Sequence, residues 1–184
     1  MDTPEFSDRL IYTVQAGLDG GEELLAMREW RLCNEPGTGR PLLTSLNGEQ
    51  VWLGPAFESP WSPDQPPGPS IGVHGLKRWT RHSLWRDGWF FGRKTWAWGW
   101  VALSGLVEES LGGFCAQTGA IRQLRLGPRT LALFASRRDL KDLIADLEER
   151  YQCRVKVGYP EWQISRVMRP AERREGGPDD RPPP

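Results

Sequence analysis

The segment from Trp96 to Glu109 constrains the fold most, because both of its alternating faces are apolar. One face carries Trp96, Trp98, Trp100, Ala102, Ser104 and Leu106, and the other carries Ala97, Gly99, Val101, Leu103, Gly105 and Val107. Side chains alternate between the two faces of a β-strand, so this strand must be covered on both sides. The segment therefore predicts a central strand. Its glycines at 99 and 105 predict a bulge, or the close approach of another backbone.

Shorter segments with strand character surround this central strand, and turn residues separate them. They are an edge strand at 10–14, then 24–33, 42–46, 50–53, 71–77, 114–118, 121–126, 131–135 and 153–157. Asn47-Gly48 favours a tight hairpin turn, because both residues accept a positive φ. Short strands followed by one helix predict an α+β domain that is mainly antiparallel β-sheet.

The helix is predicted from Ser136 onward, near the C-terminal end. Ser136 is a favourable N-cap, and Asp139 follows three residues later. The apolar residues at helical spacing are Leu140, Leu143, Ile144, Leu147 and Tyr151. They predict an amphipathic helix, which the short final strand at 153–157 follows.

Composition predicts one folded region between flexible ends. A chain of 184 residues fits one domain. Residues 1–9 are expected to be flexible, and residues 170–184 are rich in proline and charge and are expected to be disordered. A single α+β domain is predicted for 10–169. It contains a Pro-rich loop at 54–70, because the six prolines there cannot donate to a strand ladder.

The charge balance and the apolar pattern bear on the class of protein. Lys plus Arg is 24 and Asp plus Glu is 24, whereas a dedicated nucleic-acid binder usually has a basic excess. The start of the chain lacks secretory-signal character, and no apolar run has the length of a membrane span. The three cysteines lie far apart, which favours reduced thiols. We therefore expect a cytoplasmic protein without membrane contact.

Metal and cofactor motifs do not occur in the sequence. There is no Cys-x-x-Cys, and the two histidines, His74 and His82, have no cysteine near them. Neither glycine-rich phosphate-binding motif is present. We therefore expect no metal and no cofactor.

Residues 77–94, here called the Trp/Arg segment, form the leading candidate for a binding surface. The residues that interleave rings and charges are Arg78, Trp79, Arg81, Trp85, Arg86, Trp89, Arg93 and Lys94. Trp and Arg dominate the energetics of interfaces, which favours a protein partner. Rings that stack on bases and guanidinium groups that meet phosphates favour single-stranded nucleic acid instead. A third interpretation places the rings in the core, with arginine stems along their edges.

His74 is the leading candidate for catalysis, because Gly72 and Gly75 leave room for a ligand beside it. It could act as a general base, with Glu108 or Glu109 to orient its ring. The structural alternative is a half-buried histidine bonded to a backbone carbonyl. Cys115 and Cys153 fit small buried side chains, and a reactive thiol is the alternative.

Several short motifs carry a family resemblance. They are Leu-Ala-Met-Arg-Glu-Trp-Arg at 25–31, Gly-Val-His-Gly at 72–75, Val-Ala-Leu-Ser-Gly-Leu-Val-Glu-Glu at 101–109 and Gly-Phe-Cys-Ala at 113–116. With the helix that ends in tyrosine, they resemble a family of small bacterial single-domain proteins of unknown function, frequent in actinobacteria. The chain departs at Gly75, where alanine is expected, and at 114–116, where an arginine is more usual. The resemblance implies one compact domain and assigns no catalytic residue, and it points to His74 and to 105–109.

These observations predict a non-enzymatic binding or adaptor module that acts through protein–protein contact at the Trp/Arg segment. A nucleic-acid-binding accessory protein that uses the same segment is the alternative, and a small enzyme that uses His74 is the third.

Overall fold

Long antiparallel strands dominate the part of the chain that the structure describes. The computed structural model describes residues 10–15, 23–62, 64, 71–77, 95–127, 137–158 and 166–168. Its elements are β1 (Leu10–Val14), β2 (Glu23–Asn34), β3 (Pro41–Thr44), β4 (Val51–Trp52), β5 (Ala56–Glu58), β6 (Val73–Leu76), β7 (Thr95–Glu109), β8 (Gly113–Leu126), α3 (Arg137–Tyr151), β9 (Arg154–Val157) and β10 (Arg166–Met168). A mainly antiparallel sheet with a helix confirms the α+β class.

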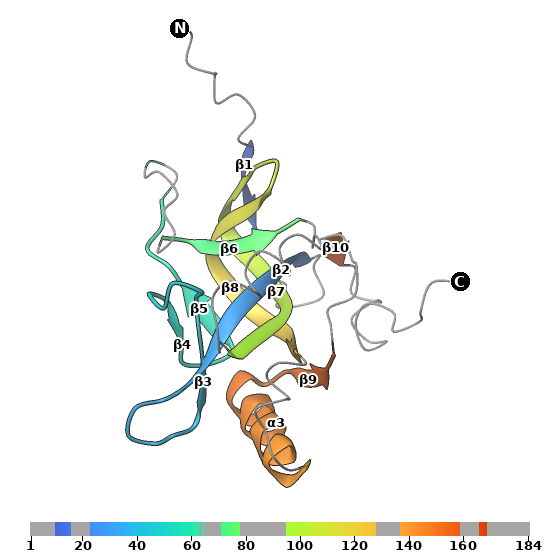
Figure 1. Ribbon diagram of the computed structural model, residues 1–184. Helices are drawn as coiled ribbons and strands as arrows, with labels where there is room; N and C mark the ends of the chain where they lie inside the picture. Colours follow the sequence, from blue (N-terminus) through green and yellow to red (C-terminus); the bar gives the residue numbers. More distant parts are fainter. Residues whose placement is uncertain are drawn as a thin grey trace, which may run out of the picture.

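Four of the strands close into a ring. β7 pairs with β8, β8 with β6, β6 with β2, and β2 with β7 again. β3 and β4 extend the sheet beyond β2, and β1 extends it beyond β7 (Figure 1). β5 pairs with β8, β10 pairs with β2, and β9 runs parallel to the end of β8. The long strands β7 and β8 thus pair with β1, β2, β5, β6 and β9, whereas β3, β4 and β10 join the sheet through β2.

β7 is buried on both faces, as its sequence predicts. Val101 and Leu103 belong to the main core, which includes Ala26 and Val73 from neighbouring strands of the ring. Trp98, Trp100 and Ala102 belong to a second apolar cluster, which also contains Leu25 and Met27 of β2. Because residues two apart share a face, the two clusters lie on opposite sides of the strand.

Both predicted glycine effects in β7 are confirmed. Gly105 has a φ of +79°, and the register with β8 shifts between Ser104 and Val107, so a bulge forms there. At Gly99, a Cβ atom would lie 1.9 Å from the carbonyl oxygen of Gln123. Close approach of the β8 backbone therefore requires glycine at this position.

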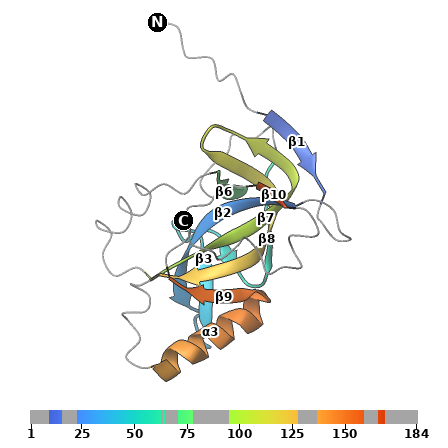
Figure 2. The same cartoon turned by 90° about the vertical axis from the view of Figure 1, so that its right-hand side faces the viewer.

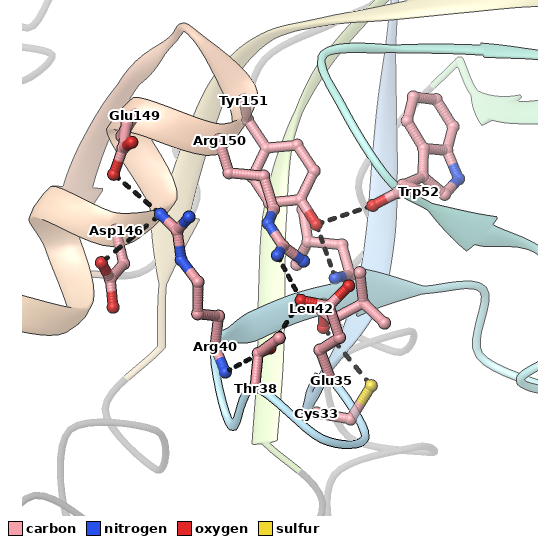
Figure 3. A network of polar contacts seen from close by, with 11 residues as sticks. Cys33, Glu35, Thr38, Arg40, Leu42, Trp52, Asp146, Glu149, Arg150 and Tyr151 are labelled. Carbon is pink, nitrogen blue, oxygen red and sulfur yellow. Dashed lines mark hydrogen bonds and ion pairs between the residues drawn. The ribbon is translucent and has the colours of Figure 1, made fainter.

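A tyrosine of α3 completes the pairing of β3 with β4. The Leu43 N–H donates to the Tyr151 hydroxyl over 2.8 Å, and that hydroxyl donates to the Trp52 carbonyl over 2.9 Å (Figure 3). Leu43 and Trp52 are register partners, so the hydroxyl stands where a direct backbone hydrogen bond would otherwise run. Tyr151 is fully buried, together with Leu147 one turn earlier.

Ion pairs fix the same helix to the turn between β2 and β3. Arg150 lies 2.6 Å from Glu35, and Arg40 lies 2.7 Å from Glu149 and 3.7 Å from Asp146 (Figure 3). Hydrogen bonding from Arg150 lowers the pKa of Glu35, and the same hydrogen bond raises the pKa of Arg150. These contacts hold α3 beside the β2–β3 turn, at the end of the molecule away from β1 (Figures 1 and 2).

Three predictions about strands are wrong. The segments 114–118 and 121–126 form one strand, β8, because Gly119 lets the strand continue past Val73, which a Cβ there would approach to 2.6 Å. Within the predicted loop 54–70, residues 56–58 form β5, because no proline lies between Pro55 and Pro60. The strand at 153–157 is not the last, because β10 follows it.

Several predictions lie outside the described residues. They are the flexible segment 1–9, the strand at 131–135, the N-cap at Ser136 and the tail at 170–184.

Candidate functional site

The structure brings His74 and Glu108 into one row across three strands. His74 of β6 is the register partner of Cys115 of β8, and Cys115 is the register partner of Glu108 of β7. Directly paired residues of antiparallel strands share a face of the sheet, so the thiol lies between the imidazole and the carboxylate. Sequence reasoning nominated each of these residues, but it did not place Cys115 between the other two.

Glu109 lies on the other face of the sheet and does not join this row. Its carboxylate accepts a hydrogen bond from the Tyr12 hydroxyl over 3.1 Å and lies 2.6 Å from the Lys77 ammonium. The hydrogen bond from Lys77 lowers the pKa of Glu109, and burial raises the pKa of Tyr12 to about 12. Glu109 therefore links β1 to the end of β6 and does not orient His74.

In this row, His74 and Cys115 both contact a backbone carbonyl, as side chains with a structural role do. His74 is half-buried, and its Nε2 atom lies 2.9 Å from the carbonyl oxygen of Ile71. The Cys115 thiol donates to the same carbonyl over 3.8 Å. Burial, with the nearby charge of Glu108, raises the pKa of Cys115 to about 12. Because the thiolate is the nucleophilic form, burial of this thiol disfavours a nucleophilic role.

Arg28 is the unusual polar residue of this region, and sequence reasoning did not nominate it. Its side chain is only 6 % exposed, and it lies on the strand face that carries Ala26 and Trp30 of the main core. The guanidinium donates to the His74 carbonyl and to the Gln50 side-chain oxygen, each over 2.7 Å. The signal in the sequence was that Arg28 shares a strand face with Trp30 and Leu32, where an apolar residue is expected.

Two indole rings replace the carboxylate that a buried arginine usually has. The guanidinium carbon lies 5.9 Å from the Trp30 ring centroid and 5.4 Å from that of Trp52, within the range of cation–π attraction. Within the described residues, no carboxylate forms an ion pair with Arg28, and its Nε has no hydrogen-bond partner. Burial lowers the pKa of Arg28 to about 10.

Apolar side chains are exposed at the end of the molecule opposite α3. We call the surface formed by Leu10, Ile11 and Leu111 the distal edge. Leu111 is 95 % exposed in the turn that joins β7 to β8, and Leu10 and Ile11 of β1 are 60 % and 46 % exposed. Leu10 is the register partner of Glu109, two residues before Leu111. Figure 2 shows β1 as the outermost strand beside this hairpin.

A second exposed group lies on the opposite edge of the sheet. Val51 of β4 is 40 % exposed, and Leu53 follows it on the same side of the strand. β4 has only two residues, whereas β1 has five. The distal edge therefore includes the longer of these two edge strands.

The Trp/Arg segment lies outside the described residues, except for Lys77. The proposed contact residues Trp79, Arg81, Trp85, Arg86, Trp89, Arg93 and Lys94 are all in the undescribed part.

Comparison of the chain with protein-family models, with curated proteins and with solved structures finds no match. Among the described residues, no group of three or more His, Cys, Asp or Glu side chains is placed to hold a metal ion. In the part of the chain that the structure describes, no helix is both long enough and apolar enough to cross a membrane.

Proposed function

We propose that this protein is a non-enzymatic binding module that acts through protein–protein contact, and that the distal edge receives an extended segment of the partner. The observation that carries the proposal is β1, an exposed edge strand with the sequence Leu-Ile-Tyr-Thr-Val. It is the last strand of the sheet on its side and pairs only with β7 among the described strands.

β1 lacks the features that usually protect an exposed edge strand. A free edge strand presents unpaired N–H and C=O groups to any extended chain, and natural proteins block it with lysine, proline or a bulge. β1 contains no charged residue and no proline, and its register with β7 is regular. An added strand would gain backbone hydrogen bonds from β1 and apolar contact from Ile11 and Leu111.

The Trp/Arg segment is proposed as a second contact with the same partner. Its first residue, Lys77, lies 2.6 Å from Glu109, which is the register partner of Leu10 in β1. Tryptophan and arginine in this segment would supply the anchors that an edge strand lacks.

Peptides selected from a phage-displayed random library against the purified protein test the distal edge. We expect extended, apolar peptides, whose affinity falls at least about tenfold in Ile11→Lys, because a lysine there blocks strand addition. Val51→Lys is the matched control, since it makes the same kind of change at a similar exposure on the opposite edge. Equal affinity for Ile11→Lys and wild-type protein would refute the assignment to the distal edge.

The Trp/Arg segment is tested in the same assay and against nucleic acid. Trp85→Ala should lower peptide affinity by about 2 kcal/mol if the segment contributes a hot spot. A single-stranded oligonucleotide should show no binding at physiological salt. Salt-sensitive oligonucleotide binding that disappears in the Arg81→Glu, Arg86→Glu double variant would favour the nucleic-acid function instead.

A further inference from the structure

We infer that the partner at the distal edge is a second copy of this chain, whose β1 pairs antiparallel with the first β1 about a twofold axis. The inference rests on the proposed function, because it names the protein that the distal edge binds. Twofold dimers are the commonest soluble oligomers, and their contact surface must be complementary to itself.

The sequence of β1 satisfies that requirement. With the axis at Tyr12, Leu10 of each copy stands opposite Val14 of the other, Ile11 stands opposite Thr13, and the two Tyr12 residues face one another. Leu10, Tyr12 and Val14 share one face of the strand, so every cross-strand pair on that face is apolar or aromatic. Such pairs are the stabilising unit of an antiparallel sheet.

The charges around β1 favour a second copy over an unrelated protein. Near a twofold axis each charge meets its own symmetry mate, so charged residues there oppose self-association. β1 has no charge, and Gln15 after it is neutral. Two carboxylates of β7 stand opposite β1: Glu108 is buried, and Glu109 is paired with Lys77 at 2.6 Å. The formal net charge of the chain is zero, so no long-range repulsion separates two copies.

Three of the five side chains of β1, those of Leu10, Ile11 and Thr13, are exposed and can contact a second copy. Tyr12 and Val14 are half-buried against the main core of their own chain. The Tyr12 hydroxyl already donates to Glu109, so it needs no partner from the second copy. One strand from each copy makes a small interface, and a contact of this size is expected to be weak and reversible.

Sedimentation equilibrium of the full chain, over a wide range of concentration, tests the dimer. We expect a reversible monomer–dimer equilibrium for wild-type protein and a dissociation constant raised at least about tenfold in Ile11→Lys. Val51→Lys should dimerise as the wild type does. A wild-type protein that stays monomeric throughout, or a dimer that Ile11→Lys leaves unchanged, would overturn the inference.

Disulfide trapping tests the register. Because Ile11 is expected to face Thr13 of the other copy, an equimolar mixture of Ile11→Cys and Thr13→Cys should form cross-linked dimer faster than either variant alone. Val51→Cys, mixed with either variant, serves as the control for random collision. Cross-linking no faster in the mixture than in that control would contradict the antiparallel pairing about Tyr12.

The two proposals fail in different ways. If wild-type protein is monomeric but selected peptides still bind and lose affinity in Ile11→Lys, the distal edge is a binding site for another protein. If peptides fail to bind and no dimer forms, both proposals are wrong.

Discussion

Gly75 shows at the scale of a single residue how tightly the inside of the ring is packed. A Cβ atom at this position would lie 2.4 Å from the Ala26 Cβ and 3.4 Å from a methyl carbon of Leu103. The family resemblance leads one to expect alanine here. With Ala26 on the facing strand, this chain has no room for that methyl group.

Gly75→Ala should therefore destabilise the protein by about 1–3 kcal/mol, the usual cost of overpacking a well-filled core. Urea unfolding measures the change. Gly112→Ala is the matched control, because no atom lies within 4 Å of a Cβ there. Adding Ala26→Gly to Gly75→Ala should restore part of the lost stability. A double variant no more stable than Gly75→Ala alone would show that the clash is not with Ala26.

Cys115 gives the protein a stability that depends on pH. Its pKa is raised from 9.0 to about 12, so folding favours the protonated thiol. That contribution is complete below pH 9 and is lost as pH rises toward 12. Cys153 acts in the same direction, since burial raises its pKa to about 12 also. Arg28 acts in the opposite direction, but only above pH 10, where its folded-state pKa lies.

Between pH 9 and 10 the free energy of unfolding should fall, by at most about 1.4 kcal/mol per pH unit for each of the two thiols. Chemical unfolding at closely spaced pH values measures this slope. Cys115→Ala should flatten the slope, whatever it does to absolute stability. A variant with the slope of the wild type would mean that the thiol of Cys115 is not held protonated by the fold.

At the scale of elements, α3 stabilises the sheet through one hydroxyl group. Tyr151 bridges the Leu43 N–H and the Trp52 carbonyl, so the β3–β4 pair depends on the helix for one of its connections. The surface pair of Arg40 with Glu149 is more exposed than the pair of Arg150 with Glu35. Exposed ion pairs contribute little, so the tyrosine is the stronger link.

Tyr151→Phe should cost about 2–4 kcal/mol, because it leaves two buried backbone groups without their partner. Tyr12→Phe is the matched control. It removes one hydroxyl that donates to the partly exposed Glu109, and it should cost about 0.5–1.5 kcal/mol. Guanidinium unfolding compares the two. Hydrogen exchange at the Leu43 amide should accelerate only in Tyr151→Phe, and equal exchange in both variants would contradict the bridge.

At the scale of the whole molecule, a late strand completes the sheet. β10 pairs with the start of β2, where Arg166 is opposite Leu25 and Val167 is opposite Leu24, and both leucines are buried. The sequence after residue 170 is rich in proline and charge and can bury little apolar surface.

Two truncated variants distinguish the contribution of β10 to stability from that of the tail at 170–184. Removal of residues 170–184 should leave the melting temperature unchanged. Removal of residues 166–184 should lower stability by about 1–3 kcal/mol, because the ladder between β10 and β2 is lost. If the shorter deletion lowered the melting temperature by several degrees, the tail would have to contact the folded part.

The sequence by itself determined the features that depend on neighbouring residues. The alternation of residues 96–107 identified a strand buried on both sides, and Gly99 and Gly105 identified its close contact and its bulge. The edge strand at 10–14 was predicted with the bounds that β1 has. These are local signals, because strand alternation and backbone conformation act over a few residues.

Only the tertiary structure decided what depends on pairing between distant strands. It closed β2, β6, β8 and β7 into a ring, placed Cys115 between His74 and Glu108, and buried Arg28 against two indoles. It also joined two predicted segments into β8 and added β5 and β10 to the sheet. The period of a strand shows which face a side chain takes, but not which strand lies beside it. That choice is made by packing and hydrogen bonding between residues far apart in the chain.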